Sequence, residues 1–265
     1  MSGAKLLTRQ DVVRAKLRLL GMHFKAGVGH IGGNLSAIDI LLGLHHNVLQ
    51  PDDAFVLSKG HAAGALYVTL WSLGRLTDED LDTFHKDDTL LSAHPPAAGL
   101  RDILFATGSL GHGPSLCCGL ALARKLRGDP SRVYCLTSDG EWDEGSNWEA
   151  LIFARQKALD NLTLIVDLNG LQGFGTTAEV ADLDSLAQKF LEFGWDVDEI
   201  DGHDIRAIVE SAGRSSNRPR AIIASTIKGN GVSFMADRME WHYLPLTKEL
   251  FEQAVREIEA ACNGN

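Results

Sequence analysis

Short, mainly apolar stretches alternate with helix-like segments along most of the chain. The apolar stretches span 54–57, 103–105, 132–136, 162–166, 195–197 and 221–224. Segments with helical periodicity lie between them, at 61–74, 112–127, 146–160, 182–193 and 204–216. Such alternation is typical of βαβ units, in which helices bury parallel strands on both faces. The sequence therefore predicts an α/β fold with a doubly wound, mostly parallel sheet and helices on both faces.

Further helices are expected at the two ends of this alternation. Apolar residues recur at helical spacing over 13–24, which predicts a helix that ends at Gly27 or Gly29. Two more helices are expected, over 36–48 and 248–261. A chain of 265 residues is long enough to bury one sizeable core, and we expect a single domain over 1–265.

The charge balance argues against several kinds of partner. The chain has 35 acidic and 25 basic residues, a net charge of −10 and no lysine or arginine block, so we expect no nucleic acid and no membrane partner. No apolar run approaches the roughly 20 residues that cross a bilayer. The cysteines form no C-x-x-C pair and are expected to be free thiols, which favours a cytoplasmic protein; they are Cys117, Cys118, Cys135 and Cys262.

Polar, glycine-rich loops follow the predicted strands. In open parallel sheets, ligands bind outside the carboxyl ends of the strands, so these loops are where chemistry is expected. They combine glycine with repeated Asp, Asn and His, which turns alone do not need. The loops span 58–61, 106–113, 138–141, 167–171 and 228–231.

Asp139 and Asn169 come directly after two consecutive predicted strands. Their oxygens should meet at one edge of the sheet and, with a backbone carbonyl, water and phosphate oxygens, form the shell that Mg²⁺ or Ca²⁺ prefers. Gly140 permits close approach of a ligand, and 146–149 reads as a capping box that opens a helix. These residues would suit a metal-bridged diphosphate site, and two ordinary turns explain the same spacing.

The sequence contains neither a Walker loop nor a Rossmann fingerprint. Gly108, Gly111 and Gly113 follow a predicted strand, but their spacing differs from G-x-G-x-x-G. A metal is physically needed in the predicted diphosphate site, because a chain with a net charge of −10 repels a diphosphate.

Six motifs, in this order and at these intervals, resemble the amino-terminal, diphosphate-binding part of transketolases. Asp139-Gly140 and Asn169 resemble the thiamine diphosphate motif, although Ser138 replaces its usual first glycine. The other motifs are Gly29-His30-Ile31-Gly32-Gly33, Leu57-Ser58-Lys59-Gly60-His61, Ala93-His94-Pro95, the loop 107–113, and the loop 228–231 followed by Trp241-His242. The resemblance implies the thiamine-diphosphate-binding fold of the diphosphate-binding (PP) domain. It also implies transfer of a two-carbon ketol unit from a ketose or ketose phosphate to an aldose.

The resemblance assigns roles to single residues. Asp139, Asn169 and the backbone carbonyl of Leu171 would hold Mg²⁺, with Ca²⁺ or Mn²⁺ as alternatives. Histidines would act on substrate hydroxyls and in proton transfer, which suits a side chain that titrates near neutrality; these are His30, His61, His94 and His242. The expected cofactor contacts are His61, Gly108, Ser109, Leu110, Asp139, Gly140, Glu141 and Asn169.

Three further positions depart from the family pattern. Lys59, His112 and Tyr243 stand where transketolases commonly carry asparagine, glutamine and glycine. We interpret these departures as bearing on the substrate, which makes a specialised sugar plausible, such as an apulose-type or sulfonated one. Glu144 matches a position that faces a partner subunit, with a solvated carboxylate at a helix start as the alternative. The remaining histidines are expected on the surface or on helix faces; they are His23, His45, His46, His85 and His203.

The resemblance covers only the first part of full-length transketolases. We expect the pyrimidine-binding domain, with the glutamate that activates the cofactor, on a separate carboxy-terminal subunit. The chain would then be the amino-terminal subunit of a split transketolase, active only with that partner, in an α2β2 heterotetramer. Two alternatives stay open: another thiamine diphosphate enzyme component, such as one similar to 1-deoxyxylulose-5-phosphate synthase, and a non-catalytic cofactor-binding paralogue.

Overall fold

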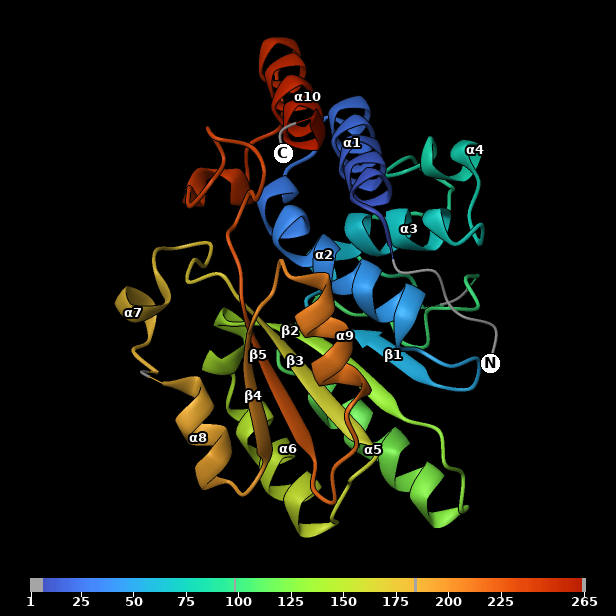
Figure 1. Ribbon diagram of the computed structural model, residues 1–265, viewed down its shortest axis with the longest axis vertical. Coiled ribbons are helices and arrows are strands. Elements are labelled where there is room, and N and C mark those ends of the chain that lie inside the picture. Colours follow the sequence, from blue (N-terminus) through green and yellow to red (C-terminus); the bar gives the residue numbers. More distant parts are fainter. Residues whose placement is uncertain (1–6, 98, 184, 264–265) are drawn as a thin grey trace.

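A five-stranded parallel sheet forms the centre of the molecule (Figure 1). The computed structural model describes residues 7–97, 99–183 and 185–263. The strand order is β1-β2-β3-β5-β4, and every neighbouring pair is parallel. The strands are β1 (Ala54–Leu57), β2 (Val133–Ser138), β3 (Leu162–Leu168), β4 (Asp196–Asp201) and β5 (Arg220–Ser225). This arrangement confirms the predicted α/β class.

Helices cover both faces of the sheet, because successive side chains of a strand point to opposite faces. Phe55 and Leu57 of β1 join one apolar core, whereas Ala54 and Val56 join the other. The first core is formed with α1 (Arg9–Ala26), α2 (Ile31–Asn47), α3 (Ala63–Ser72), α9 (Ile205–Gly213) and α10 (Lys248–Asn263). The second core is formed with α5 (Gly113–Leu126), α6 (Gly145–Gln156) and α8 (Leu186–Glu192).

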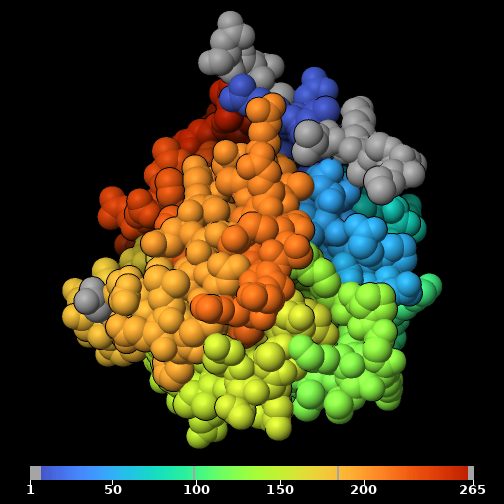
Figure 2. Space-filling view, turned by 60° about the horizontal axis from the view of Figure 1, so that its bottom comes forward, coloured from blue at the N-terminus to red at the C-terminus, as the bar shows by residue number. Residues whose placement is uncertain are grey.

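The remaining elements are short. They comprise α4 (Asp78–Leu81), α7 (Thr177–Val180) and three single 3-10 turns, Gly60–Ala62, Gly140–Asp143 and Met239–His242. Helix α9 contacts α2, and the orange segment that contains α9 lies beside the blue helices in the space-filling view (Figure 2). Segments from both halves of the sequence therefore build one layer.

Five of the six predicted strands are confirmed, and the one predicted at 103–105 is wrong. Ile103 is buried, but Leu104 is 46% exposed and the backbone N–H of Ile103 donates to the carbonyl of Leu100. One buried apolar side chain is enough to anchor a turn and too little to add a strand beside β1. The apolar run at 103–105 thus reflects local packing.

Helix boundaries follow the sequence less closely. Helix α1 ends before Gly27, which has the left-handed φ of +64° that the predicted stop requires. Helix α2 begins at Ile31, five residues before the predicted start, because the Gly32–Gly33 pair lies inside the helix, where Gly33 packs on His61. The predicted helix 182–193 is shorter, as α8, and residue 184 lies outside the described residues.

The predicted capping box at 146–149 is wrong. Helix α6 begins at Gly145 without a side-chain cap, and the hydroxyl of Ser146 donates to the carbonyl of Gly111 at 2.7 Å. A capping box that we did not predict precedes α7, where Thr176 and Glu179 exchange hydrogen bonds. The hydroxyl of Ser146 therefore ties the α6 start to the loop 106–113.

Two further expectations concern the cysteines and membranes. Cys117, Cys118 and Cys135 are buried free thiols, while the side chain of Cys262 lies outside the described part. None of the helices in the described ranges is both long and apolar enough to span a bilayer.

Candidate active site

The loops at the carboxyl edge of the sheet enclose a cavity of about 290 Å³. Most of the predicted site residues line it, although they come from loops far apart in the sequence. These residues are His30, His61, His94, Gly108, Leu110, Asp139, Gly140, Asn169, Leu171 and His242. Two predicted cofactor contacts, Ser109 and Glu141, are not among the lining residues. These residues therefore form one candidate site at the carboxyl ends of the strands, where parallel sheets bind ligands.

Asp139 follows β2 and presents a buried carboxylate to the cavity. One carboxylate oxygen, Oδ1, accepts from the N–H of Gly140 at 2.8 Å, and Oδ2 accepts from the N–H of Gly170 at 2.6 Å. Burial raises the pKa of Asp139 to about 6, and the nearby carboxylate of Asp167 adds to the rise. Two backbone N–H groups leave this negative charge incompletely compensated, so the site suits a cation.

Asn169 and Leu171 add two neutral oxygens beside Asp139. The side-chain oxygen of Asn169 accepts from the N–H of Leu171 at 3.2 Å. The carbonyl of Leu171 accepts from Nζ of Lys228 at 3.3 Å, so the positive charge of Lys228 lies beside this oxygen. No cluster of three or more His, Cys, Asp or Glu with metal-binding geometry occurs in the described part of the chain. A carboxylate, an amide and a carbonyl nevertheless fit Mg²⁺ or Ca²⁺ when ligand oxygens complete the shell.

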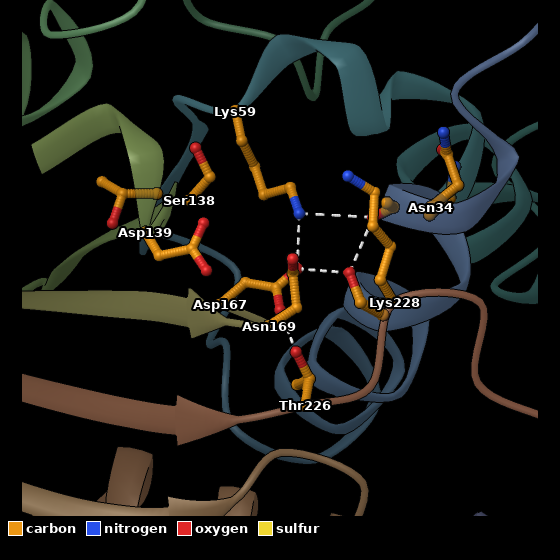
Figure 3. Close-up of polar contacts among 12 residues, drawn as sticks. Asn34, Lys59, Ser138, Asp139, Asp167, Asn169, Thr226 and Lys228 are labelled. Atoms are coloured by element: carbon orange, nitrogen blue, oxygen red, sulfur yellow. Dashed lines mark hydrogen bonds and ion pairs between the residues drawn. The ribbon is translucent and has the colours of Figure 1, made fainter. Parts of the chain in front are cut away.

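A buried ion pair lies beneath this wall of the cavity (Figure 3). Lys59 and Asp167 have fully buried side chains and pair directly, and Asp167 also accepts from Ser36 at 2.7 Å and from Thr226. Burial raises the pKa of Asp167, but the ammonium of Lys59 lowers it by more. The pKa of Asp167 therefore lies below its usual range. Lys59 is fully buried and does not line the cavity, so any effect of Lys59 on the substrate is indirect, through Asp167 and the backbone of Gly33.

Four histidine rings face one another across the cavity. The ring of His30 lies 5.7 Å from His61, 6.3 Å from His94 and 5.0 Å from His242, centroid to centroid. Burial lowers the pKa of all four, and that of His242 falls to about 3 because Lys228 adds its positive charge. The rings are therefore neutral at pH 7 and able to accept a proton or donate one.

His30 is held in an unusual backbone conformation. Its φ is +64°, in the left-handed region, and it stands at the start of α2. Its backbone N–H donates to the carbonyl of His242 at 3.1 Å, which brings the two residues together. The buried Nδ1 of His30 has no hydrogen-bond partner among the described residues. This nitrogen is therefore an unsatisfied polar atom inside the protein, beside the cavity that the His30 ring lines.

Lys228 is the functional candidate that our sequence reasoning missed. Its Nζ contacts the carbonyl of Leu171 and lies 3.1 Å from Nδ1 of His242, and burial lowers its pKa to about 8. The loop 228–231 was expected to contribute to the site, but the sequence assigned no role to Lys228 itself. The only signal was a basic residue at a strand end in an acidic chain.

The loop 106–113 forms the opposite wall. Gly108 has a φ of +127°, and a Cβ there would lie 2.4 Å from the His94 ring, so only glycine fits. Glu141 lies behind the loop, where it accepts from the N–H of Gly111 at 2.9 Å and from the hydroxyl of Ser58. Glu141 therefore supports the loop and does not face the cavity.

The other polar positions lie outside the cavity, apart from Tyr243. His112 is exposed at the start of α5, Glu144 is exposed at the start of α6, and Tyr243 lines the cavity. His23 and His45 lie on helices α1 and α2, which agrees with the expectation of surface or helix-face positions, and both are buried; His203 is half-buried between β4 and α9, where it hydrogen-bonds Asp39. His46 is half-buried and His85 is exposed.

Known proteins share both the sequence pattern and the fold. Residues 8–259 match the family described as "Transketolase, thiamine diphosphate binding domain". The chain is 40% identical over 253 residues to an apulose-4-phosphate transketolase subunit from Phocaeicola vulgatus, over 91% of this chain and 90% of that protein. It is also 40% identical over 247 residues to the 6-deoxy-6-sulfo-D-fructose transketolase subunit SqwG of Clostridium sp. MSTE9, over 89% of this chain and 90% of that protein.

A solved structure gives the same picture. The crystal structure of transketolase from Campylobacter jejuni superposes with a TM-score of 0.84 at 30% sequence identity. The match covers 96% of this chain but 43% of that one. The chain thus spans less than half the length of this solved transketolase, whereas it covers nine tenths of each of the two subunits.

Proposed function

Because the chain belongs to the transketolase family, as the match over residues 8–259 shows, we propose that it is the thiamine-diphosphate-binding subunit of a two-chain transketolase. One observation carries the proposal: the cavity joins an oxygen-lined wall at Asp139, Asn169 and Leu171 to a cluster of neutral histidines. The first wall suits a metal-bound diphosphate and the second suits a polyhydroxylated substrate.

The metal and the diphosphate belong at the oxygen-lined wall. In this proposal Asp139, Asn169 and the carbonyl of Leu171 hold Mg²⁺, and Ca²⁺ or Mn²⁺ could replace it. Lys228 adds a positive charge beside the same carbonyl, which helps to hold an anionic ligand in a chain with a net charge of −10. When bound, thiamine diphosphate supplies the carbon nucleophile and the electron sink for cleavage of the ketose.

We assign the remaining cofactor contacts to residues that line the cavity. Gly140 and Gly108 present backbone without side chains, and Leu110 and His61 offer apolar and aromatic surface. We assign Glu141 to support of the loop 106–113, because its carboxylate is fully buried against Gly111 and Ser58. Ser109, which is exposed and outside the lining, contributes at most through its backbone.

In this proposal the histidines donate and accept the protons of the reaction. An ammonium group only donates, so Nδ1 of His242 accepts from Lys228 and the ring proton lies on Nε2, which can donate to a substrate oxygen. The His30 ring lines the cavity and burial lowers its pKa, so it is a neutral base that can take the proton of a donor hydroxyl when the C–C bond breaks. His61 and His94 complete the ring of neutral imidazoles that hold the sugar.

The substrate belongs to the class of sugars or sugar phosphates. The relatives from Phocaeicola vulgatus and Clostridium sp. are named for apulose-4-phosphate and 6-deoxy-6-sulfo-D-fructose, and each is 40% identical to this chain. Both names describe sugars that carry an anionic group. We propose a specialised sugar of this kind as donor or acceptor.

The complementary subunit supplies the other half of the site in this proposal. Relatives of matching length are named as subunits of a transketolase, which supports a single diphosphate-binding domain over residues 1–265 and a pyrimidine-binding domain on a second chain. We propose an α2β2 heterotetramer in the cytoplasm. Light scattering on the co-purified complex measures its stoichiometry.

Ketol transfer measured with and without the partner tests this function. The chain is purified alone and with its native partner, and each sample receives thiamine diphosphate, Mg²⁺, ketose donors and aldose acceptors. We expect transfer only when both chains are present. Full transfer by the chain alone would contradict the two-chain assignment. Consumption of pyruvate in place of a ketose would favour a 1-deoxyxylulose-5-phosphate synthase-like component, and cofactor binding without any turnover would favour a non-catalytic paralogue.

A further inference from the structure

Tyr243 stands at the mouth of the cavity, beside the histidines. Its side chain is 56% exposed, and its ring centroid lies 4.7 Å from that of His242 and 6.5 Å from that of His30. Within the described ranges its phenol hydroxyl forms no hydrogen bond. Tyr243 therefore presents a free donor and acceptor next to the groups that we assign to the substrate.

The phenol hydroxyl lies over the backbone of Gly173. A Cβ added to Gly173 would be 2.3 Å from Oη and 3.2 Å from Cζ of Tyr243, closer than real Cβ contacts. The same Cβ would meet the ring of His242 at an ordinary 3.6 Å. Gly173 and Tyr243 thus form a steric pair, in which the glycine leaves the space that the phenol uses.

The backbone of Tyr243 is equally confined on the other wall. Its carbonyl oxygen would lie 2.4 Å from a Cβ at Gly29, the residue that precedes His30. Tyr243 therefore lies between the loop that leads into α2, against which its backbone packs, and the loop that follows β3, over which its phenol lies. With its backbone held in this way, Tyr243 places its ring over the mouth of the cavity.

We propose that Tyr243 determines which sugar enters the cavity. Its ring narrows the mouth between His242 and Gly173, and its hydroxyl bonds a substrate hydroxyl remote from the reacting carbon. This inference rests on the proposed function. The reacting end of an aldose lies among the histidines, so the hydroxyls further along a longer aldose reach the rim where Tyr243 lies. A short aldose ends before it.

The steric pair is testable without any turnover. Affinity for thiamine diphosphate with Mg²⁺ is measured for Gly173→Ala, Tyr243→Gly and the double variant. We expect Gly173→Ala to weaken binding about threefold, because the new Cβ must displace either the exposed phenol or the loop that carries Leu171, and to have no measurable effect when Tyr243 is glycine. Gly145→Ala is the matched control, because a Cβ there meets nothing within 4 Å. Equal losses in both backgrounds would overturn the pair.

Selectivity is tested in the reconstituted two-chain enzyme. The value of kcat/KM is measured for aldoses of increasing length, from glycolaldehyde upward, with the wild type, Tyr243→Phe and Tyr243→Gly. We expect Tyr243→Phe to lower kcat/KM about three- to tenfold for the long acceptors and to leave glycolaldehyde unchanged, because one hydrogen bond is lost. Tyr243→Gly should reduce the difference in kcat/KM between long and short acceptors further, because it widens the mouth of the cavity.

The possible failures are distinguishable. An inactive wild-type complex would overturn the proposed function itself. An active wild type whose acceptor ratios are the same in both variants would overturn the selectivity assigned to Tyr243. If Tyr243→Gly weakens binding of the complementary chain while the ratios stay constant, Tyr243 is an interface residue and our inference is wrong.

Discussion

The amino and carboxyl edges of the central sheet both bury charge, but they neutralise it differently. At the amino edge, the fully buried Arg220 pairs with Asp198, and its Nη1 donates to the carbonyl of Ser211 at 2.5 Å. At the carboxyl edge, Asp139 and Lys228 face the cavity, and burial shifts the pKa of each toward neutrality, to about 6 and about 8. Arg220 is neutralised mainly by a carboxylate of the protein, whereas Asp139 and Lys228, unlike the buried Lys59–Asp167 pair beneath them, face a cavity where a ligand can bind.

This difference separates stability from function within one sheet. Buried groups that keep their partners contribute to folding, and breaking such a pair is costly. Groups with displaced pKa values in a cavity mark a site that is completed by what it binds. Changes at the amino edge should therefore alter the free energy of unfolding, and changes at the carboxyl edge should alter binding.

The largest effect is expected for Asp139→Asn. Loss of the carboxylate removes the charged metal ligand, so affinity for thiamine diphosphate with Mg²⁺ should fall more than about 100-fold. The free energy of unfolding of the unliganded chain at pH 7 should not fall and should rise by up to about 3 kcal/mol, because removal of a carboxylate whose pKa burial raises to about 6 outweighs the loss of a neutral hydrogen bond. Calorimetric titration and urea unfolding measure the two effects. A large loss of stability with intact binding would erase the contrast between the edges.

Arg220→Met should give the reverse pattern. The variant removes a buried partner of Asp198, which remains 25% exposed and can recover water, so we expect a destabilisation of about 2–3 kcal/mol. Affinity for thiamine diphosphate should stay within about twofold. Urea unfolding and calorimetry again provide the readouts. A tenfold loss of affinity would show that the amino edge reaches the cavity.

The pH dependence of metal binding should sharpen the contrast. The raised pKa of Asp139, about 6, means that the ion must displace a proton below pH 6, so affinity should fall toward tenfold per pH unit there and stay level above pH 7. Arg220→Met should show the same profile. Titrations of Mg²⁺ with thiamine diphosphate at pH 5, 6 and 7.5 decide the matter. A flat profile would mean that Asp139 is already ionised without the metal.

The same shift predicts a stability effect in the unliganded chain. The folded-state pKa of Asp139 lies above its ordinary value of 3.8, so its protonation favours the folded state. The contribution is fully present below pH 3.8 and is lost as the pH rises through 6. Asp139→Asn should remove this dependence from the unfolding free energy.

The smallest effect is expected at the exposed rim of the amino edge. Arg214 is 45% exposed and bridges Asp196 and Asp198. Arg214→Gln should cost no more than about 0.5 kcal/mol and leave cofactor affinity unchanged, because exposed ion pairs contribute little. Thermal unfolding at low and high salt checks this. A cost above about 1 kcal/mol would show that the rim acts as one network with Arg220.

The sequence predicted the scaffold well because apolar periodicity is local. Strands β1 and β2 are buried along their whole length, and the loops after the strands contain the polar residues that line the cavity. The strand expected at 103–105 failed because the same apolar signal arises when one residue, Ile103, anchors a turn. Helix boundaries were predicted less accurately, because Gly32 and Gly33 suggested a loop but lie inside α2.

The polar interior could not be predicted because its partners are distant in sequence. Lys59 and Asp167 are 108 positions apart, and only the fold shows that they neutralise each other. Lys228 approaches Leu171 and His242 from a separate loop, so no local pattern assigns it. Glu141 lies next to Asp139 and Gly140 in the sequence, yet it faces away from the cavity toward Gly111.

The left-handed backbone at His30 limits how this site can evolve. A φ of +64° is accessible to glycine and, among other residues, mainly to asparagine, aspartate and histidine. Replacements compatible with the fold are therefore few, and they exclude the branched and bulky apolar residues. Natural variation at position 30 should stay within this short list, even in descendants that have abandoned the original substrate.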